Sequence, residues 1–211
     1  MQHVELAELT PELLPFLGMA ARLQLYAFEA LAAVAAAAPG LEAKVAVSSA
    51  AGAALTRHAG LVEEIRRRDD DPIEAMRPYA DAVAAFAAQV AGSDWREDLL
   101  SAYVVFGLLD DFFLHLAAGL PGEFGERSAR LLHEDAGERA LAVVLQREIG
   151  ADPRLADVLA LWGRRLVGDT LLMARSVLSS GPGATDERIE PVLTEIIAAH
   201  TRRMDALGLT A

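Results

Sequence analysis

Five polar side chains interrupt the apolar faces of the helices that the sequence predicts, and all five are potential metal ligands. They are Gln24, His58, Asp111, Asp135 and Glu138. Imidazole and carboxylate groups bind divalent metal ions, and the carbonyl oxygen of a glutamine is a weaker ligand. A polar group buried in a bundle costs free energy unless it is hydrogen-bonded, ion-paired or bound to a metal. The set therefore predicts either a metal centre inside a helical bundle or a buried network of paired groups.

Each of these positions also has an explanation that needs no metal. A single histidine on an apolar face, such as His58, is more often a hydrogen-bonded core residue than a ligand. Asp111 and His115 are four residues apart and can form an ion pair on one helix face. Asp135 and Glu138 are three residues apart and would equally suit an exposed acidic turn. Taken one helix at a time, the two explanations stay open.

The segment 104–116 is the most informative helix in the sequence. It is apolar on every side except at Asp110, Asp111 and His115. A helix that is apolar all round is usually buried in the core. Two aspartates at its centre are therefore hard to explain as solvated surface.

Proline and glycine divide the rest of the chain into long helical segments. The composition is rich in Ala and Leu, with 53% hydrophobic residues, which favours an all-α fold in one domain spanning residues 1–211. Thr10 and Pro11 predict the start of the first helix, and Pro78 predicts a kink in the third. The expected helices cover residues 11–38, 41–68, 73–90, 95–118, 126–149, 154–178 and 187–207.

The order of the polar residues along these helices matches a known architecture. Ferritin-like di-iron proteins place one carboxylate on each of two helices and a Glu-x-x-His motif on each of the other two. The candidate ligands here fall on the first, second, fourth and fifth expected helices, and the third would form part of a long crossover.

Charge and cysteine content exclude several classes of function. The chain contains no cysteine, so thiolate catalysis, iron–sulfur clusters and cysteine-based zinc sites are excluded. A formal net charge of −12 opposes binding to nucleic acid and to anionic membranes. Charged residues interrupt the apolar stretches, so we expect no membrane span, and residues 1–10 do not have the pattern of a signal peptide. We therefore expect a cytoplasmic protein.

The chain resembles the actinobacterial ferritin-like family related to tRNA-(2-methylthio-isopentenyladenosine) hydroxylase, over almost its whole length. Five strings carry the resemblance: LYAFEAL at 25–31, AMRPY at 75–79, DWREDLLSAYV at 94–104, LALWGRRLVGDTL at 159–171 and HTRRMDALGL at 200–209. The resemblance implies a ferritin-like four-helix bundle with additional C-terminal helices. It also implies a non-haem iron site that activates dioxygen.

The metal motif departs from the pattern of that family. The resemblance places Gln24 where the family has its first glutamate, and Leu55 and His58 where it has Glu-x-x-His. Asp111 is kept, whereas Asp135 and Glu138 stand in the place of Asp-x-x-His. Leu55 is the most damaging change, because its position should supply the carboxylate that bridges two irons.

These departures leave three functions open. The site holds one iron or other divalent ion, or none, with Gln24, His58, Asp111, Asp135 and Glu138 as candidate ligands. The protein is then non-catalytic and binds a protein or a small molecule, or it has a remodelled mononuclear or acid–base site. The alternative is a non-haem iron oxygenase that hydroxylates a substrate, as in tRNA modification. We also expect a homodimer, formed through the apolar last two helices.

Overall fold

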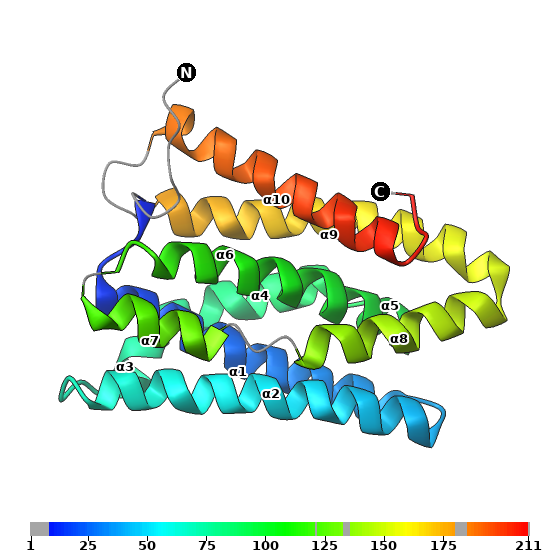
Figure 1. Ribbon diagram of the computed structural model, residues 1–211, viewed down its shortest axis with the longest axis horizontal. Helices are drawn as coiled ribbons and strands as arrows, with labels where there is room; N and C mark the ends of the chain where they lie inside the picture. The colour runs from blue at the N-terminus through cyan, green and yellow to red at the C-terminus, as the bar shows by residue number, and fades with distance from the viewer. Residues whose placement is uncertain (1–8, 121, 133–135, 180–184, 211) are drawn as a thin grey trace.

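The computed structural model describes residues 9–120, 122–132, 136–179 and 185–210, and these are almost entirely helical (Figure 1). No strand occurs among the described residues. The all-α class predicted from composition and from the Pro and Gly positions is therefore confirmed.

The first two helices, α1 (Leu13–Ala37) and α2 (Leu41–Arg66), form a long hairpin. Their packing against each other is the most extensive between any two described elements. The start of α1 differs from the prediction, because Thr10 does not cap it. The Thr10 hydroxyl instead donates a hydrogen bond of 2.6 Å to the carbonyl of Leu116, and so ties the N-terminal segment to another helix.

The crossover after α2 bends at Pro78, as predicted. A short helix α3 (Pro72–Met76) is capped by the Asp71 side chain, which accepts a hydrogen bond from the backbone N–H of Ile73. One 3₁₀ turn, η2 (Arg77–Tyr79), contains Pro78 and leads into α4 (Ala80–Val90). The change of helix type follows from the proline, which cannot donate a backbone hydrogen bond.

The central helix is continuous but changes its winding in the middle. It begins as α5 (Trp95–Ser101), which is capped by the Asp94 side chain, and ends as α6 (Gly107–Ala117). Between them lies a π-helical segment, η3 (Ala102–Phe106), whose residues are all buried. Insertions of π helix are rare and occur frequently at functional sites.

Two described helices cover the region of the predicted fifth helix. Helix α7 (Glu123–Leu132) is followed by α8 (Ala136–Ala151), and the residues between them lie outside the described part of the chain. The last two helices, α9 (Pro153–Ser179) and α10 (Asp186–Ala206), pack against each other and agree with the prediction.

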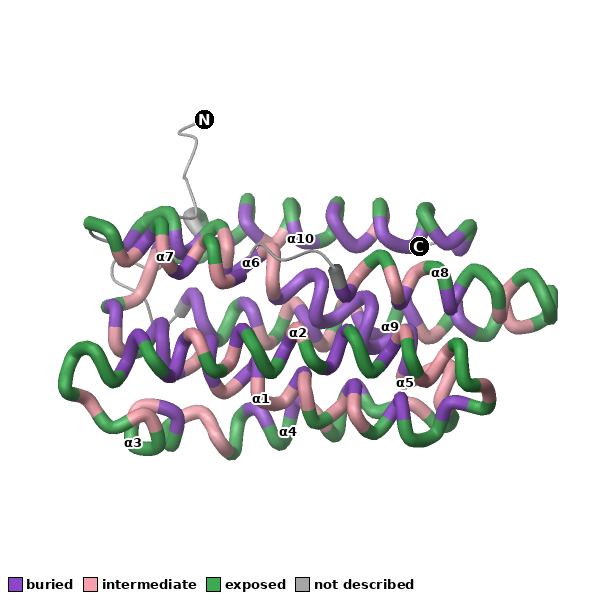
Figure 2. The backbone as a smooth tube through the Cα atoms, turned by 60° about the horizontal axis from the view of Figure 1, so that its bottom comes forward, coloured by how far each residue is buried: buried purple, intermediate pink, exposed green. Residues whose placement is uncertain are grey.

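The helices lie roughly along one direction and enclose one apolar core. Helices α1 and α2, the central helix and α7–α8 form the bundle, and α9 and α10 cover its other side (Figure 1). The central helix is almost wholly buried, whereas α10 has one buried and one exposed face (Figure 2). Polar groups on the central helix therefore have to find partners inside the protein.

Two described stretches, Leu13–Ala37 and Trp95–Ala117, are long and apolar enough to cross a membrane by length and composition. In the second, 72% of the apolar window is buried inside the bundle, and in the first, 39%. This is weak evidence for a membrane span, because the core helix of a soluble protein passes the same test.

Candidate functional site

Asp110 lies at the centre of the bundle and joins three helices. Its Oδ1 accepts a hydrogen bond of 2.5 Å from the Gln24 amide on α1. Its Oδ2 lies 3.2 Å from a terminal nitrogen of Arg57 on α2. Arg57 in turn donates from Nε to the Gln24 carbonyl oxygen, at 2.9 Å. Carboxylate, amide and guanidinium thus form a closed ring of contacts between α1, α2 and α6.

The rotation of α2 about its axis brings Arg57 into this ring. The side of α2 that faces the bundle carries Ala50, Ala54, Arg57 and Leu61, and all four are buried. Leu55 is 41% exposed and points away from the site. The sequence interpretation placed Leu55, Leu61, Val62 and Ile65 on one inward stripe around His58. Leu61, Val62 and Ile65 are buried as predicted, whereas Leu55 is not.

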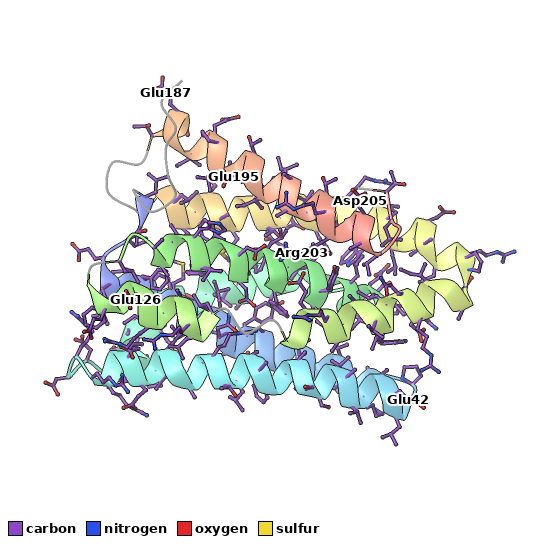
Figure 3. The ribbon with its side chains drawn as sticks, viewed as in Figure 1. Glu42, Glu126, Glu187, Glu195, Arg203 and Asp205 are labelled. Atoms are coloured by element: carbon purple, nitrogen blue, oxygen red, sulfur yellow. The ribbon has the colours of Figure 1, made fainter. Side chains whose placement is uncertain are left out.

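Asp111 belongs to a second cluster, built around Arg203 of α10. An Arg203 terminal nitrogen donates a hydrogen bond of 2.8 Å to Oδ2 of Asp111. The Nε of Arg203 lies 3.0 Å from Oε1 of Glu138 on α8. One guanidinium group therefore links α6, α8 and α10, and Figure 3 labels Arg203 where α10 passes over α6. Both arginines are buried, with exposed fractions of 7% for Arg57 and 8% for Arg203.

Burial sets the protonation of the first cluster. It raises the pKa of Asp110 to about 6, although the Arg57 charge and the Gln24 hydrogen bond both act in the opposite direction. Removing a carboxylate from water favours its neutral form, and here this effect outweighs the attraction of the guanidinium.

The predicted ligands do not all meet. His58 Nδ1 lies 2.8 Å from the backbone carbonyl oxygen of Ala21. This is the contact of a hydrogen-bonded core histidine, and it needs no metal. His115 Nδ1 contacts the backbone carbonyl of Asp111 at 2.7 Å instead of its carboxylate. Gln24 joins the first cluster, whereas Asp111 and Glu138 join the second. Asp135 lies outside the described residues.

A cavity of about 510 Å³ lies beside both clusters, between α2, the central helix and α8. The polar groups of its wall come from Arg57, Tyr103, Asp110, Asp111, Glu138 and Arg139. The volume falls within the range of about 300–1,000 Å³ that is usual for sites of small organic ligands.

The residues that the structure describes around the cavity do not by themselves fit the di-iron centre that the fold family implies. Iron would need carboxylate oxygens that already neutralise Arg57 and Arg203, and an arginine side chain keeps its positive charge at all ordinary pH values. No group of three or more His, Asp or Glu in the described part of the chain could hold a metal ion. Asp135 is not among the residues described, so the complete predicted ligand set is not tested.

Sequence reasoning missed Arg57 and Arg203, yet both carry a signal. Arg57 follows Ala50 and Ala54 at helical spacing, and Arg203 follows Val192, Ile196 and Ala199 in the same way. An arginine at the end of such an apolar stripe can be identified as buried only if it is already known that this face of the helix points into the core. On α2 the neighbouring faces are also rich in alanine, so periodicity alone does not select the face.

A helical bundle of this form is typical of the ferritin-like class. The chain belongs to the ferritin-like domain family of actinomycetes, which matches residues 10–182. The predicted ferritin-like fold is thereby confirmed. The comparison with curated proteins finds no match.

Proposed function

We propose that this protein is a ferritin-like protein that works without a metal and binds a small organic molecule in the cavity beside its two arginine clusters. One observation carries the proposal: Arg57 and Arg203 supply the positive charge that bound metal ions supply in a di-iron bundle. They neutralise Asp110, Asp111 and Glu138 within 3.2 Å. Like charges at such short range repel strongly, so a metal ion could bind only after displacing these ion pairs.

The shape of the site supports ligand binding. The cavity combines apolar walls with a few converging polar groups, which is typical of small-molecule sites. Part of its wall is the π-helical segment η3, which supplies Ala102, Tyr103 and Phe106. We further propose that the protein acts in the cytoplasm.

The alternative is the iron-dependent hydroxylase that the resemblance implies, with tRNA as one substrate. The net charge of −12 opposes a polyanionic substrate. The buried arginines oppose the iron, and a mononuclear site would meet the same difficulty.

Metal loading separates these functions. The full-length protein is treated with a chelator, incubated anaerobically with ferrous iron, desalted and assayed for iron per chain. We expect far less than one iron per chain. Two irons per chain would overturn the proposal in favour of the hydroxylase, and one would favour a remodelled mononuclear site.

Ligand binding needs a separate measurement. A mixture of small organic fragments is screened by ligand-observed NMR against the wild-type protein and against Ala102→Leu. Ala102 is 3% exposed and lines the cavity, so the larger side chain fills part of it. We expect fragments whose binding to the wild type is lost in Ala102→Leu. Equal binding to both proteins would contradict a role for this cavity.

A further inference from the structure

Helix α9 carries large apolar side chains on its outer face. Val158, Leu161 and Leu172 are 50%, 66% and 64% exposed, although the other side of the helix packs against the bundle. Their spacing places them on one stripe of the helix, and Arg165 and Gly168 continue this stripe between the two leucines. Apolar side chains that gather on one exposed face mark a contact surface more often than the same residues scattered singly.

Gly168 lies in the middle of this stripe, and the fold of the single chain gives no reason for a glycine there. No described atom outside the neighbouring helix backbone lies within 4 Å of a Cβ atom placed at this position. The residue is exposed and has no positive φ. Glycine destabilises the interior of a helix relative to alanine. The missing side chain does leave a gap on the surface of α9 that a long side chain of a second molecule can fill.

The residues of this face are arranged symmetrically about one point of the helix. Three pairs, Asp157 with Arg175, Leu161 with Leu172, and Arg165 with Gly168, each have their midpoint between residues 166 and 167 or at residue 166. A second copy of α9 that runs antiparallel, related by a two-fold axis at this midpoint, would place each residue opposite the other member of its pair. The face is therefore complementary to itself in charge, in apolar character and in shape.

We propose that two copies of this protein form a homodimer through the outer faces of α9, with the two helices antiparallel. Leu161 packs on the partner's Leu172, and Arg165 extends across the partner's Gly168. Asp157 forms an ion pair with the partner's Arg175. Two-fold dimers use the same surface patch on both copies, as this arrangement does. The proposal assigns the homodimer expected from the sequence to one of the last two helices.

The order of the charges favours the antiparallel arrangement over the parallel one. In a parallel pair each residue would meet its own copy, so Arg165 would face Arg165 and Arg175 would face Arg175, and like charges repel. In the antiparallel pair Arg165 approaches the partner's Asp169 instead, whose side chain is 21% exposed. Arg154, at the N-terminal end of α9, would face the C-terminal end of the partner's α9, where the helix dipole favours a positive charge.

The contacts that these arginines make within one chain leave them available to a partner. The Arg165 side chain is 61% exposed, and its Nε lies 3.9 Å from Asp169 on the same helix. Arg175 pairs with Asp186 at 2.6 Å, and the two side chains are 47% and 79% exposed. Exposed ion pairs of this kind contribute little to stability, so both guanidinium groups can turn toward a partner at small cost. The dimer is independent of the proposed ligand cavity, because no residue of α9 lines it.

Sedimentation of the full-length protein at micromolar to millimolar concentrations tests the dimer. A single pair of helices buries less than the roughly 800 Å² per partner of a standard interface, so we expect a dissociation constant in the micromolar range. Leu161→Asp should raise this constant at least tenfold. Leu41→Asp is the matched control, because Leu41 is 73% exposed on α2, and it should leave the constant unchanged. A wild type that stays monomeric, or a Leu161→Asp variant that dimerises equally well, would overturn the proposal.

An exchange of charges tests the pairing of Asp157 with the partner's Arg175. Asp157→Arg and Arg175→Asp should each raise the dissociation constant several-fold at low ionic strength, and the double variant should restore it. The two positions are 18 residues apart on one helix, about 27 Å at 1.5 Å per residue, so a recovery arises only between chains. A double variant that dimerises as weakly as the single variants would show that this register is wrong.

Cross-linking tests the direction of the helices. The chain has no cysteine, so single cysteines can be introduced without interference. Leu161→Cys chains mixed with Leu172→Cys chains should be joined by a short bismaleimide, whereas neither variant should be joined to itself. In the antiparallel pair, two copies of the same position are 11 residues apart along the helices, roughly 16 Å. Efficient cross-linking of each variant with itself would indicate parallel helices and overturn the proposed arrangement.

Discussion

The guanidinium group of Arg203 lies against the backbone of Gly107, across the contact between α10 and α6. A Cβ atom at position 107 would lie 3.0 Å from Cζ of Arg203 and closer still to its Nε. Because Gly107 has no side chain, the guanidinium group of Arg203 on α10 can pack directly against the backbone of the buried helix α6. Without that room, Arg203 could not reach Asp111 and Glu138 together.

The first prediction tests this contact. Gly107→Ala should lower the free energy of unfolding by about 1–3 kcal/mol, because the guanidinium must move away from its two carboxylates. Gly168→Ala is the control, since no atom lies within 4 Å of a Cβ placed at that exposed position of α9. The control should gain roughly 0.5–1 kcal/mol from the helix preference of alanine. Urea denaturation measures both, and a neutral Gly107→Ala would refute the steric argument.

The second prediction compares two neighbouring aspartates. Asp110→Ala removes the group that accepts from Gln24 and pairs with Arg57, leaves both of these polar side chains buried without it, and should cost about 3 kcal/mol or more. Asp111→Ala should cost about 1 kcal/mol or less, because Arg203 keeps Glu138 and the Asp111 side chain is already 47% exposed. The two variants have the same chemistry and serve as controls for each other. Equal losses in chemical denaturation would contradict the two-cluster arrangement.

The third prediction concerns pH. The pKa of Asp110 is raised from 3.8 to about 6 in the folded protein, so the folded state holds this proton over a range in which the unfolded state has lost it. The stability that this proton contributes is present below about pH 4 and lost as the pH rises through about 6. The wild type should therefore lose roughly 3 kcal/mol relative to Asp110→Asn between these values. Denaturation of both proteins at a series of pH values would show it, and a constant difference would contradict it.

The fourth prediction concerns His200 on α10. This side chain is 2% exposed, and neither ring nitrogen has a hydrogen-bond partner in the described part of the structure. Replacing it with leucine, which is close in size, should stabilise the protein by about 1–3 kcal/mol at pH 8. An unchanged or lower free energy of unfolding would indicate that the imidazole has a partner.

The pH dependence of that variant provides a second check. Burial, and then the Arg203 charge, lower the pKa of His200 below its usual value of 6.5. Below about pH 6.5, His200 is protonated in the unfolded chain but remains neutral in the folded protein. The free energy of unfolding of the wild type therefore decreases as the pH falls below about 6.5. The advantage of His200→Leu should increase over the same range.

The helices themselves were largely predictable, because the signals that start and end them are local. Asp94 caps α5 through backbone groups two and three residues away. Pro78 changes the winding of the chain at its own position.

The candidate site was predictable only in part. Gln24, Asp111 and Glu138 stood out as polar residues on apolar stripes, and all three lie in the two central clusters. Arg57 was missed because α2 is rich in alanine on adjoining faces, so its inward side depends on how it packs against α1. The prediction for Asp135 remains untested, since that residue lies outside the described part of the chain.

By itself, the sequence determined the helical class, the order and approximate bounds of the helices, and the presence of charges that must be buried. These follow from residue preferences and spacing within a few turns of helix. Only the tertiary structure decided what neutralises those charges. Arg57 approaches Asp110 from α2, and Arg203 approaches Asp111 from 92 residues away in the chain. Such partners depend on which helix faces meet, and that is settled by the packing of the whole core.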